Sequence, residues 1–248
     1  MLRHRVIPVV LLDGYSVVKT IKFDVRRNLG NPITVARIYN SRNVDELILL
    51  DIDASKDGRH IDLETIEDIA SECFMPLTIG GGLKSCDEIR LALQKGADKV
   101  VLNTAALRNP QLIKDASAQF GCQCIVVSID VIKEGGAYKI FSHAGVSPSW
   151  NLLDWCRLVE SMGAGEIFLN SVDEDGKMSG YDYTLIKNVA EAVKIPVIAC
   201  GGASNPADCI EAVRHGAAAA AVASLFHFTD YTPNECRQAM REVNIPVR

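Results

Sequence analysis

The strongest constraint on this chain is the regular alternation of short apolar segments with amphipathic ones. Eight apolar segments are expected to form strands: residues 5–12, 46–52, 76–79, 99–103, 124–130, 166–170, 196–199 and 218–224. Helical periodicity separates most of them, as at residues 62–73, 85–96, 184–194 and 205–216. Eight strand–helix units in 248 residues predict an α/β fold, the (βα)8 or TIM barrel. No linker-like segment divides the chain, so we expect a single domain over residues 1–248.

The two halves of the chain resemble each other, which indicates two half-barrels at about residues 1–120 and 121–248. "DELILLDIDASKDG" (45–58) aligns with "GEIFLNSVDEDG" (165–176), and "GADKVVLNTAAL" (96–107) aligns with "GAAAAAVASLFH" (216–227). The repeat also identifies the alanine-rich segment 218–224 as a strand. Extended to the first strand of each half, it makes Leu11 the counterpart of Asp130.

Glycine-rich turns follow equivalent strands in the two halves. Gly81 and Gly82 follow the third strand, and Gly201 and Gly202 follow the seventh. The next strand ends at Asn103 and Thr104 in the first half and at Ser224 in the second. Glycine lets a backbone approach a ligand closely, and N–H groups at helix starts bind anions. Either turn alone is compatible with a plain loop, but the pair predicts two sites for a phosphorylated small molecule with a phosphate at each end.

Composition excludes several other classes of protein. The net charge of −5 and the pI near 5.6 argue against a nucleic-acid partner. No segment has the length of a membrane span or the pattern of a secretory signal, so we expect a cytoplasmic protein that does not bind membranes. The eight cysteines are scattered through apolar or helical segments, which favours reduced core thiols over a disulfide or metal site. We expect neither a metal nor a cofactor.

Several motifs resemble one known family over essentially the whole chain. They include "LLDIDAS", "PLTIGGGLKS", "GADKVVLNTAA", "VVSID", "GAGEIFLNSVDEDG" and "IPVIACGGAS". The family is the cyclase (HisF-type) subunit of imidazole glycerol phosphate synthase. The resemblance implies a (βα)8 barrel, classed as a lyase, that receives ammonia from a glutaminase (HisH-type) subunit at its bottom face. That ammonia cyclises and cleaves a bis-phosphorylated ribulosyl aminoimidazole at the top, which yields imidazole glycerol phosphate and an aminoimidazole carboxamide ribotide.

The resemblance also implies roles for individual residues. Asp130 matches one of two acid–base aspartates, and Lys19 matches a lysine in the loop after the first strand. The implied phosphate sites are Gly82, Asn103 and Thr104 in one half, and Gly202, Ala223 and Ser224 in the other. The implied ammonia gate is a charged ring of Arg5, Glu46, Lys99 and Glu166, for which a purely structural salt-bridge cluster is the alternative. Asp98 matches a residue that contacts the glutaminase.

One departure from the family concerns the second acid–base group. Leu11 stands where the family has its first catalytic aspartate, in "VVLLDG" instead of "CLDVKDG". Acid–base catalysis of this kind uses two groups on opposite sides of the reacting centre, and leucine cannot transfer a proton. Asp13 lies two residues further along and is a candidate substitute, because alternate residues of an extended strand share a face.

The loss of this aspartate leaves three functions open. The segment "VVLLDG", together with both implied phosphate sites, also resembles a paralogous branch of the family linked to lipopolysaccharide and other surface-polysaccharide sugars. There the barrel and a glutaminase supply ammonia to a sugar amidotransferase that forms an acetamidino group. We expect this role, because ammonia delivery needs the gate but not both acids. The alternatives are an authentic cyclase of histidine biosynthesis and a non-catalytic scaffold that binds a phosphosugar.

Overall fold

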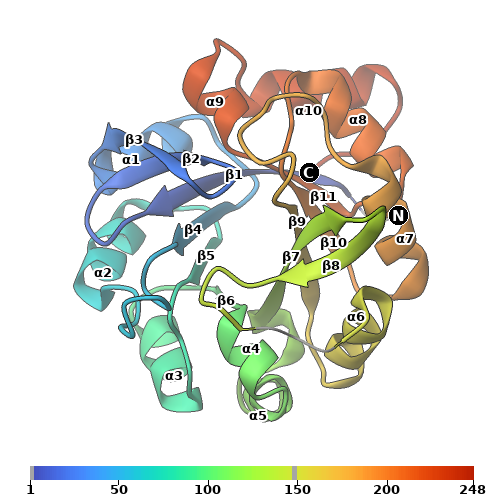
Figure 1. Cartoon of the computed structure of the whole chain (residues 1–248). Coiled ribbons are helices and arrows are strands. Elements are labelled where there is room, and N and C mark those ends of the chain that lie inside the picture. The colour runs from blue at the N-terminus through green and yellow to red at the C-terminus, as the bar shows by residue number, and fades with distance from the viewer. Residues whose placement is uncertain (1–2, 147–149) are drawn as a thin grey trace.

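Eight parallel strands run in chain order around a closed barrel (Figure 1). The computed structural model describes residues 3–146 and 150–248. The barrel strands are β1 (Arg5–Leu12), β4 (Leu47–Asp51), β5 (Leu77–Gly80), β6 (Lys99–Leu102), β7 (Ile125–Glu134), β9 (Glu166–Ser171), β10 (Val197–Cys200) and β11 (Ala219–Val222). The alanine-rich β11 pairs in parallel with β1, with Ala219 opposite Arg5, and closes the barrel. The predicted (βα)8 barrel is confirmed.

Helices surround the barrel (Figure 1). The longer ones are α1 (Pro32–Ser41), α2 (Leu63–Glu72), α3 (Cys86–Gln94), α5 (Gln111–Phe120), α6 (Leu152–Ser161), α7 (Tyr183–Ala192), α8 (Pro206–Arg214) and α10 (Pro233–Glu242). The four helices predicted above correspond to α2, α3, α7 and α8. Each follows an N-cap side chain that accepts a backbone N–H: Asp62, Ser85, Asp182 and Asn205. These caps satisfy donors that a helix start leaves unpaired.

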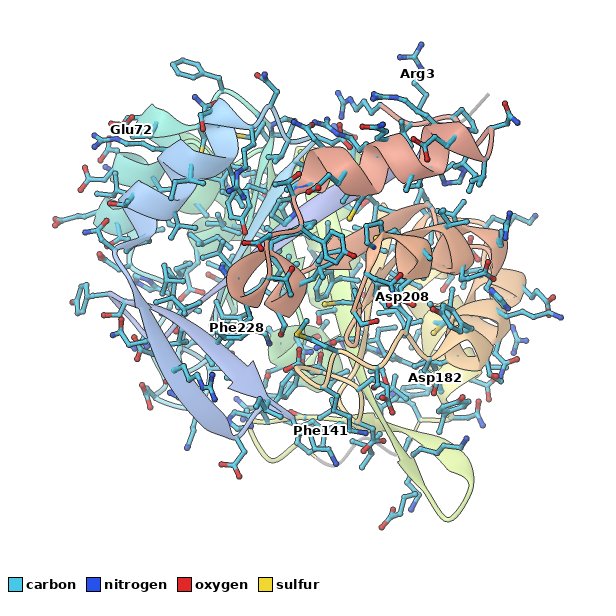
Figure 2. All side chains as sticks on the ribbon, turned by 90° about the horizontal axis from the view of Figure 1, so that it is seen from above. Arg3, Glu72, Phe141, Asp182, Asp208 and Phe228 are labelled. Carbon is cyan, nitrogen blue, oxygen red and sulfur yellow. The ribbon has the colours of Figure 1, made fainter. Side chains whose placement is uncertain are left out.

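Three short helical segments and two hairpins complete the described chain. The short helices are α4 (Thr104–Arg108), α9 (Ser224–Phe228) and the 3₁₀ segment η1 (Cys122–Cys124). The predicted strand at 124–130 therefore starts one residue later, because Cys124 belongs to the 3₁₀ turn. Two antiparallel hairpins, β2 (Val17–Ile21) with β3 (Val25–Gly30) and β7 with β8 (Ala137–Phe141), extend one end of the barrel. Figure 2 shows both at the end where Phe141 lies, away from Arg3 and Glu72.

Side chains on each barrel strand alternate between the barrel interior and the layer under the helices. On β1, Ile7, Val9 and Leu11 belong to the inner apolar cluster. Val6, Val10 and Leu12, which alternate with them along the strand, belong to the larger cluster under the helices. This is the two-residue period of an extended chain. Arg5 thus begins and Leu11 ends the same inward-facing row of side chains.

The thiols of the described residues are all free. Four of the eight cysteines are buried, at positions 156, 200, 209 and 236, and Cys122 is exposed. No group of three or more potential metal-binding side chains occurs within residues 3–146 and 150–248. In the same part of the chain, no helix combines the length and the apolar character needed to cross a membrane.

The two ends of the chain are joined at the bottom of the barrel. His4 forms a parallel bridge with Val247. On the last helix, Arg237 donates to the carboxylate of Asp45 over 2.8 Å, and that carboxylate also accepts the backbone N–H of Val6 over 3.1 Å. Asp45 and Arg237 are 7% and 8% exposed, so the ion pair is shielded from water. It links α10 to the first two barrel strands.

We expect Arg237→Met to lower the free energy of unfolding by about 3 kcal/mol, because it leaves the carboxylate of Asp45 buried without its ion-pair partner. Urea denaturation measures this change. Arg214→Met is the matched control, because Arg214 pairs with Glu211 on the surface of α8; its effect should stay under about 0.5 kcal/mol. Similar losses in both variants would contradict a special role for the buried pair.

Candidate active site

A cavity of about 140 Å³ opens at the carboxyl ends of the barrel strands. Its wall includes Leu11, Leu50, Asn103, Asp130 and Asn170, which come from the ends of five strands or from the residue just after one. The β2–β3 hairpin contributes Lys19 from β2 and Phe23 from the turn between its two strands. Active sites of (βα)8 barrels occupy this end. The cavity is therefore the candidate active site.

Asp130 is a carboxyl in the wall of this cavity whose pKa lies far above its ordinary value. Burial raises the pKa of its carboxyl from 3.8 to about 7, although hydrogen bonds from Asn103 and Asn170 lower it. The amide nitrogen of Asn103 lies 2.8 Å from the Asp130 carboxylate. A group with a pKa near 7 exchanges protons readily at neutral pH, so Asp130 is suited to general acid–base work.

Lys19 is buried beneath the β2–β3 hairpin and is held by an acidic residue from a distant loop. Its Nζ lies 3.1 and 3.3 Å from the two carboxylate oxygens of Asp175, which follows β9. The hydroxyl of Thr20 donates to the same carboxylate over 3.1 Å, and Lys22 donates its backbone N–H to the Asp175 carbonyl. The hairpin is thereby fastened over one side of the barrel mouth.

The opposite side of the hairpin is fastened by a second ion pair. Arg26 on β3 donates through both terminal nitrogens to Asp53, in the loop after β4. That hydrogen bonding lowers the pKa of the Asp53 carboxyl below its ordinary value. The hairpin therefore contacts loops of both half-barrels.

The first glycine turn, residues 80–82, packs directly against the backbone of Arg59 and His60. Gly82 has φ +67°, and a Cβ there would lie 1.9 Å from the carbonyl oxygen of Arg59. Gly81 has φ +135° and accepts the N–H of Ile61 over 2.9 Å. The neighbouring helix α4 starts at Thr104, which is buried and lines the cavity. Only glycine fits this turn, whether or not it binds an anion.

The second glycine turn, residues 201–202, repeats this arrangement. A Cβ on Gly202 would lie 2.1 Å from the carbonyl oxygen of Gly180, whose N–H donates to Gly202 over 2.8 Å. Gly201, Gly202, Ala223 and Ser224 line a separate recess of about 10 Å³. Asp175, Cys200 and Ala223 border both this recess and the main cavity. The two turns therefore lie across one barrel mouth, and the second is the more enclosed.

The charged ring lies at the opposite end of the barrel, where the strands begin. Arg5 donates to Glu46 over 2.6 Å and to Glu166 over 2.5 Å. Lys99 donates to the same two carboxylates over 3.1 and 2.8 Å. Thr78 also donates to Glu46 over 2.7 Å. The structure thus brings the four predicted residues together in a ring of alternating charge.

Ion pairing within the charged ring compensates for burial. Burial lowers the pKa of Arg5, but the two carboxylates outweigh it and the pKa is raised. Burial raises the pKa of Glu166, and Arg5 with Lys99 outweighs it in the other direction. Arg5 and Glu166 are therefore stabilised in their charged forms, because each pairs with two groups of opposite charge.

Asp13 and Asp98 belong neither to the cavity wall nor to the charged ring. Asp13 is exposed in the turn between β1 and β2 and is not part of the cavity wall, so it does not supply the carboxylate opposite Asp130. Leu11 is the cavity-facing residue at that position. Asp98 is exposed before β6, at the charged-ring end, and its carboxylate accepts the backbone N–H of Leu77 over 2.8 Å.

Three polar residues at the cavity end of the barrel were not predicted as site residues from the sequence. Asp51, at the end of β4, is buried and accepts two hydrogen bonds from Arg59, at 2.5 and 3.1 Å. Asp175 binds Lys19, and Asn170 lines the cavity with a buried Oδ1 that has no hydrogen-bond partner. The repeat places Asp51 and Asn170 at strand ends, and that position was the available signal.

Comparison with known proteins agrees with this geometry. A family model described as "Histidine biosynthesis protein" matches residues 5–232. The chain belongs to this family. It is 47% identical to the Campylobacter jejuni protein named "Putative imidazole glycerol phosphate synthase subunit hisF2", over 100% of this chain and 99% of that protein. It is 44% identical to "Imidazole glycerol phosphate synthase subunit HisF" of Thermococcus onnurineus, with the same coverage. The resemblance to HisF-type subunits is confirmed.

We expect the carboxyl carbon of Asp130 to titrate in ¹³C NMR spectra with a midpoint near pH 7. Asp53 is the internal control and should titrate below its ordinary range. Between about pH 4 and pH 7 the folded chain retains the Asp130 proton that the unfolded chain releases, so this residue lowers stability as pH rises. Asp130→Asn should therefore stabilise the protein more at pH 8 than at pH 5. Equal effects at both pH values, or a midpoint near 4, would contradict this assignment.

Proposed function

We propose that this chain is the ammonia-receiving barrel of a glutamine-dependent enzyme and supplies ammonia for amidation of a surface-polysaccharide sugar. The observation that carries the proposal is the pairing of an intact charged ring with a cavity that has one acid, Asp130, facing Leu11. Ammonia delivery requires an entrance and a path. Complete cyclisation requires a proton-transfer group on each side of the reacting centre.

The barrel interior supports passage of neutral ammonia. Above the charged ring the inward-facing residues are apolar, as with Ile7, Ile48, Val126 and Phe168. Such a lining disfavours ammonium, because burying an isolated cation is costly. The ring itself would have to rearrange at one ion pair to admit ammonia. A purely structural ring remains the alternative that the gate experiment below tests.

The end of the barrel with the charged ring offers a surface for a glutaminase partner of the HisH type. Phe74, in the loop that leads into β5, is 88% exposed, and Asp98 is exposed in the loop that leads into β6. An exposed phenylalanine and an exposed acidic residue at the same end of the barrel suit a partner surface with an apolar contact and a basic group. Ammonia released by a partner there would enter the barrel next to the ring.

The cavity supports binding of a phosphorylated small molecule. Its two glycine turns adjoin the starts of α4 and α9, and backbone N–H groups at such positions bind anions. Lys19 lines the cavity and pairs with Asp175, which also borders the recess at the second turn. In this proposal the ligand either reacts with the ammonia or, when bound, controls its release.

The second candidate is an authentic cyclase that forms imidazole glycerol phosphate. The pKa of Asp130 near 7 favours it, because that value suits a general acid or base. In this case another group, or water, must act in the place of the missing aspartate. The two candidates differ in how the protein responds to a restored carboxylate at position 11.

Leu11→Asp should raise cyclase turnover on the bis-phosphorylated ribulosyl aminoimidazole, with ammonium supplied, by roughly tenfold or more, since general acid–base groups contribute about 10²–10⁴. Leu11→Asn has nearly the same size and cannot transfer a proton, so it should change turnover by less than roughly threefold. Rapid wild-type cyclase turnover that neither variant improves would contradict the ammonia-delivery proposal and favour the authentic cyclase.

Lys99→Met should lower the rate of product formation from glutamine several-fold, while the rate with added ammonium changes little. The reason is that the charged ring loses one cation but Arg5 still binds both glutamates. Lys95→Met removes a surface ion pair with Glu67 and is the matched control. Equal loss of both activities in Lys99→Met would show that the ring is structural and not a gate.

A further inference from the structure

The strand registers place two chemically different pairs of side chains on opposite sides of the cavity. Leu11 on β1 is in register with Leu50 on β4, and we call this pair the leucine wall. Asp130 on β7 is in register with Asn170 on β9, and we call this pair the acid–amide wall. The internal repeat relates the two walls, position 11 to 130 and position 50 to 170. All four side chains line the cavity.

The acid–amide wall has hydrogen-bonding capacity to spare. Asn170 is 6% exposed, and its Oδ1 is a buried acceptor without a partner. Asn170 lies beside Asp130 in the strand register, and its side chain lowers the pKa of the Asp130 carboxyl. An unpaired buried acceptor is unfavourable until a donor reaches it. This oxygen lies against the second glycine turn, 2.9 Å from the position of a Cβ built on Gly201, so a ligand N–H or O–H group that reaches the turn there would satisfy it.

The leucine wall has the opposite preference. Neither leucine side chain can donate or accept a hydrogen bond, so polar ligand groups placed there lose their bonds to water without replacement. An apolar or aromatic face gains from the same contact. The two walls therefore select different sides of a bound molecule.

The two glycine turns lie between the walls. The first turn and Thr104 follow β5 and β6, which separate β4 from β7 in the barrel order. The second turn and Ser224 follow β10 and β11, which separate β9 from β1. A ligand that extends from one turn toward the other has one flank on each wall. Turning it end for end about the barrel axis exchanges its flanks.

We infer that the two walls set the direction in which a phosphorylated ligand lies across the barrel mouth, with Asn170 as a specificity-determining residue. The apolar flank of the ligand packs on Leu11 and Leu50, and its donor-bearing flank binds Asp130 and Asn170. The ligand class is a sugar phosphate or ribotide whose planar group carries N–H or O–H donors along one edge. This inference rests on the proposed phosphate-binding function of the turns.

The test uses aminoimidazole carboxamide ribotide as the probe, since it has one phosphate and its amino and carboxamide groups share one edge of the ring. Isothermal titration calorimetry gives its Kd for the wild type, Thr104→Val and Ser224→Ala. We expect one of these variants to weaken binding by roughly tenfold, the effect of losing a hydrogen bond to a charged group. The other variant should change Kd by less than roughly twofold.

Exchanging the walls should move this sensitivity to the other turn. The exchanged protein carries Leu11→Asp, Leu50→Asn, Asp130→Leu and Asn170→Leu together. Two single variants serve if that protein does not fold: Asn170→Leu and, as its counterpart on the other wall, Leu50→Asn. Each makes the walls more alike, so Thr104→Val and Ser224→Ala should then weaken binding by similar factors.

The outcomes separate this inference from the proposal beneath it. Equal sensitivity to Thr104→Val and Ser224→Ala in the wild type would overturn the inference while leaving phosphate binding intact. A preference that stays unchanged in the exchanged protein, or in both single variants, would also overturn it. No binding of the probe to the wild type would instead overturn phosphate binding at these turns.

Discussion

The two-residue period of strands in a closed barrel is the constraint on which the rest of the structure depends. Because alternate side chains point inward, the residues that begin and end a strand on the same face share one interior. Arg5 and Leu11 on β1 are such a pair, as are Glu166 and Asn170 on β9. The charged ring and the cavity are therefore the two ends of a single column of side chains. A change of register by one residue would remove both at once.

The repeat makes departures from symmetry informative. The glycine turns are equivalent in the two halves, down to a backbone contact that only glycine allows. The strand-end pairs are not equivalent, because leucines face a carboxyl and an amide. In our proposal, the two like turns bind phosphate and the unlike walls favour a ligand that binds in one direction and meets a single proton-transfer group, Asp130. This chemistry fits the delivery of ammonia better than a two-acid cyclisation.

Local sequence patterns predicted the barrel and its strand ends, because both depend on periodicity within a strand or on the repeat. The charged ring was expected only from the family resemblance, because its four residues lie on different strands. Contacts between distant loops were not predictable in this way. Lys19 and Asp175 are separated by 156 positions, and no local pattern indicates that they meet. Asp13 was offered as a substitute acid on the assumption that the strand continues. The chain instead turns after Leu12, which leaves Asp13 exposed. The β2–β3 hairpin was missed for the same reason.

The central claim is that ammonia enters at the charged ring and leaves the barrel without being used for cyclisation. The most direct test supplies glutamine labelled with ¹⁵N in its amide to a complex of this chain with a glutaminase, in the presence of the bis-phosphorylated ribulosyl aminoimidazole. Mass spectrometry then follows the label. Our account predicts that most of it is recovered as free ammonia and little as imidazole glycerol phosphate. Incorporation of one labelled nitrogen into imidazole glycerol phosphate for each glutamine hydrolysed would contradict it.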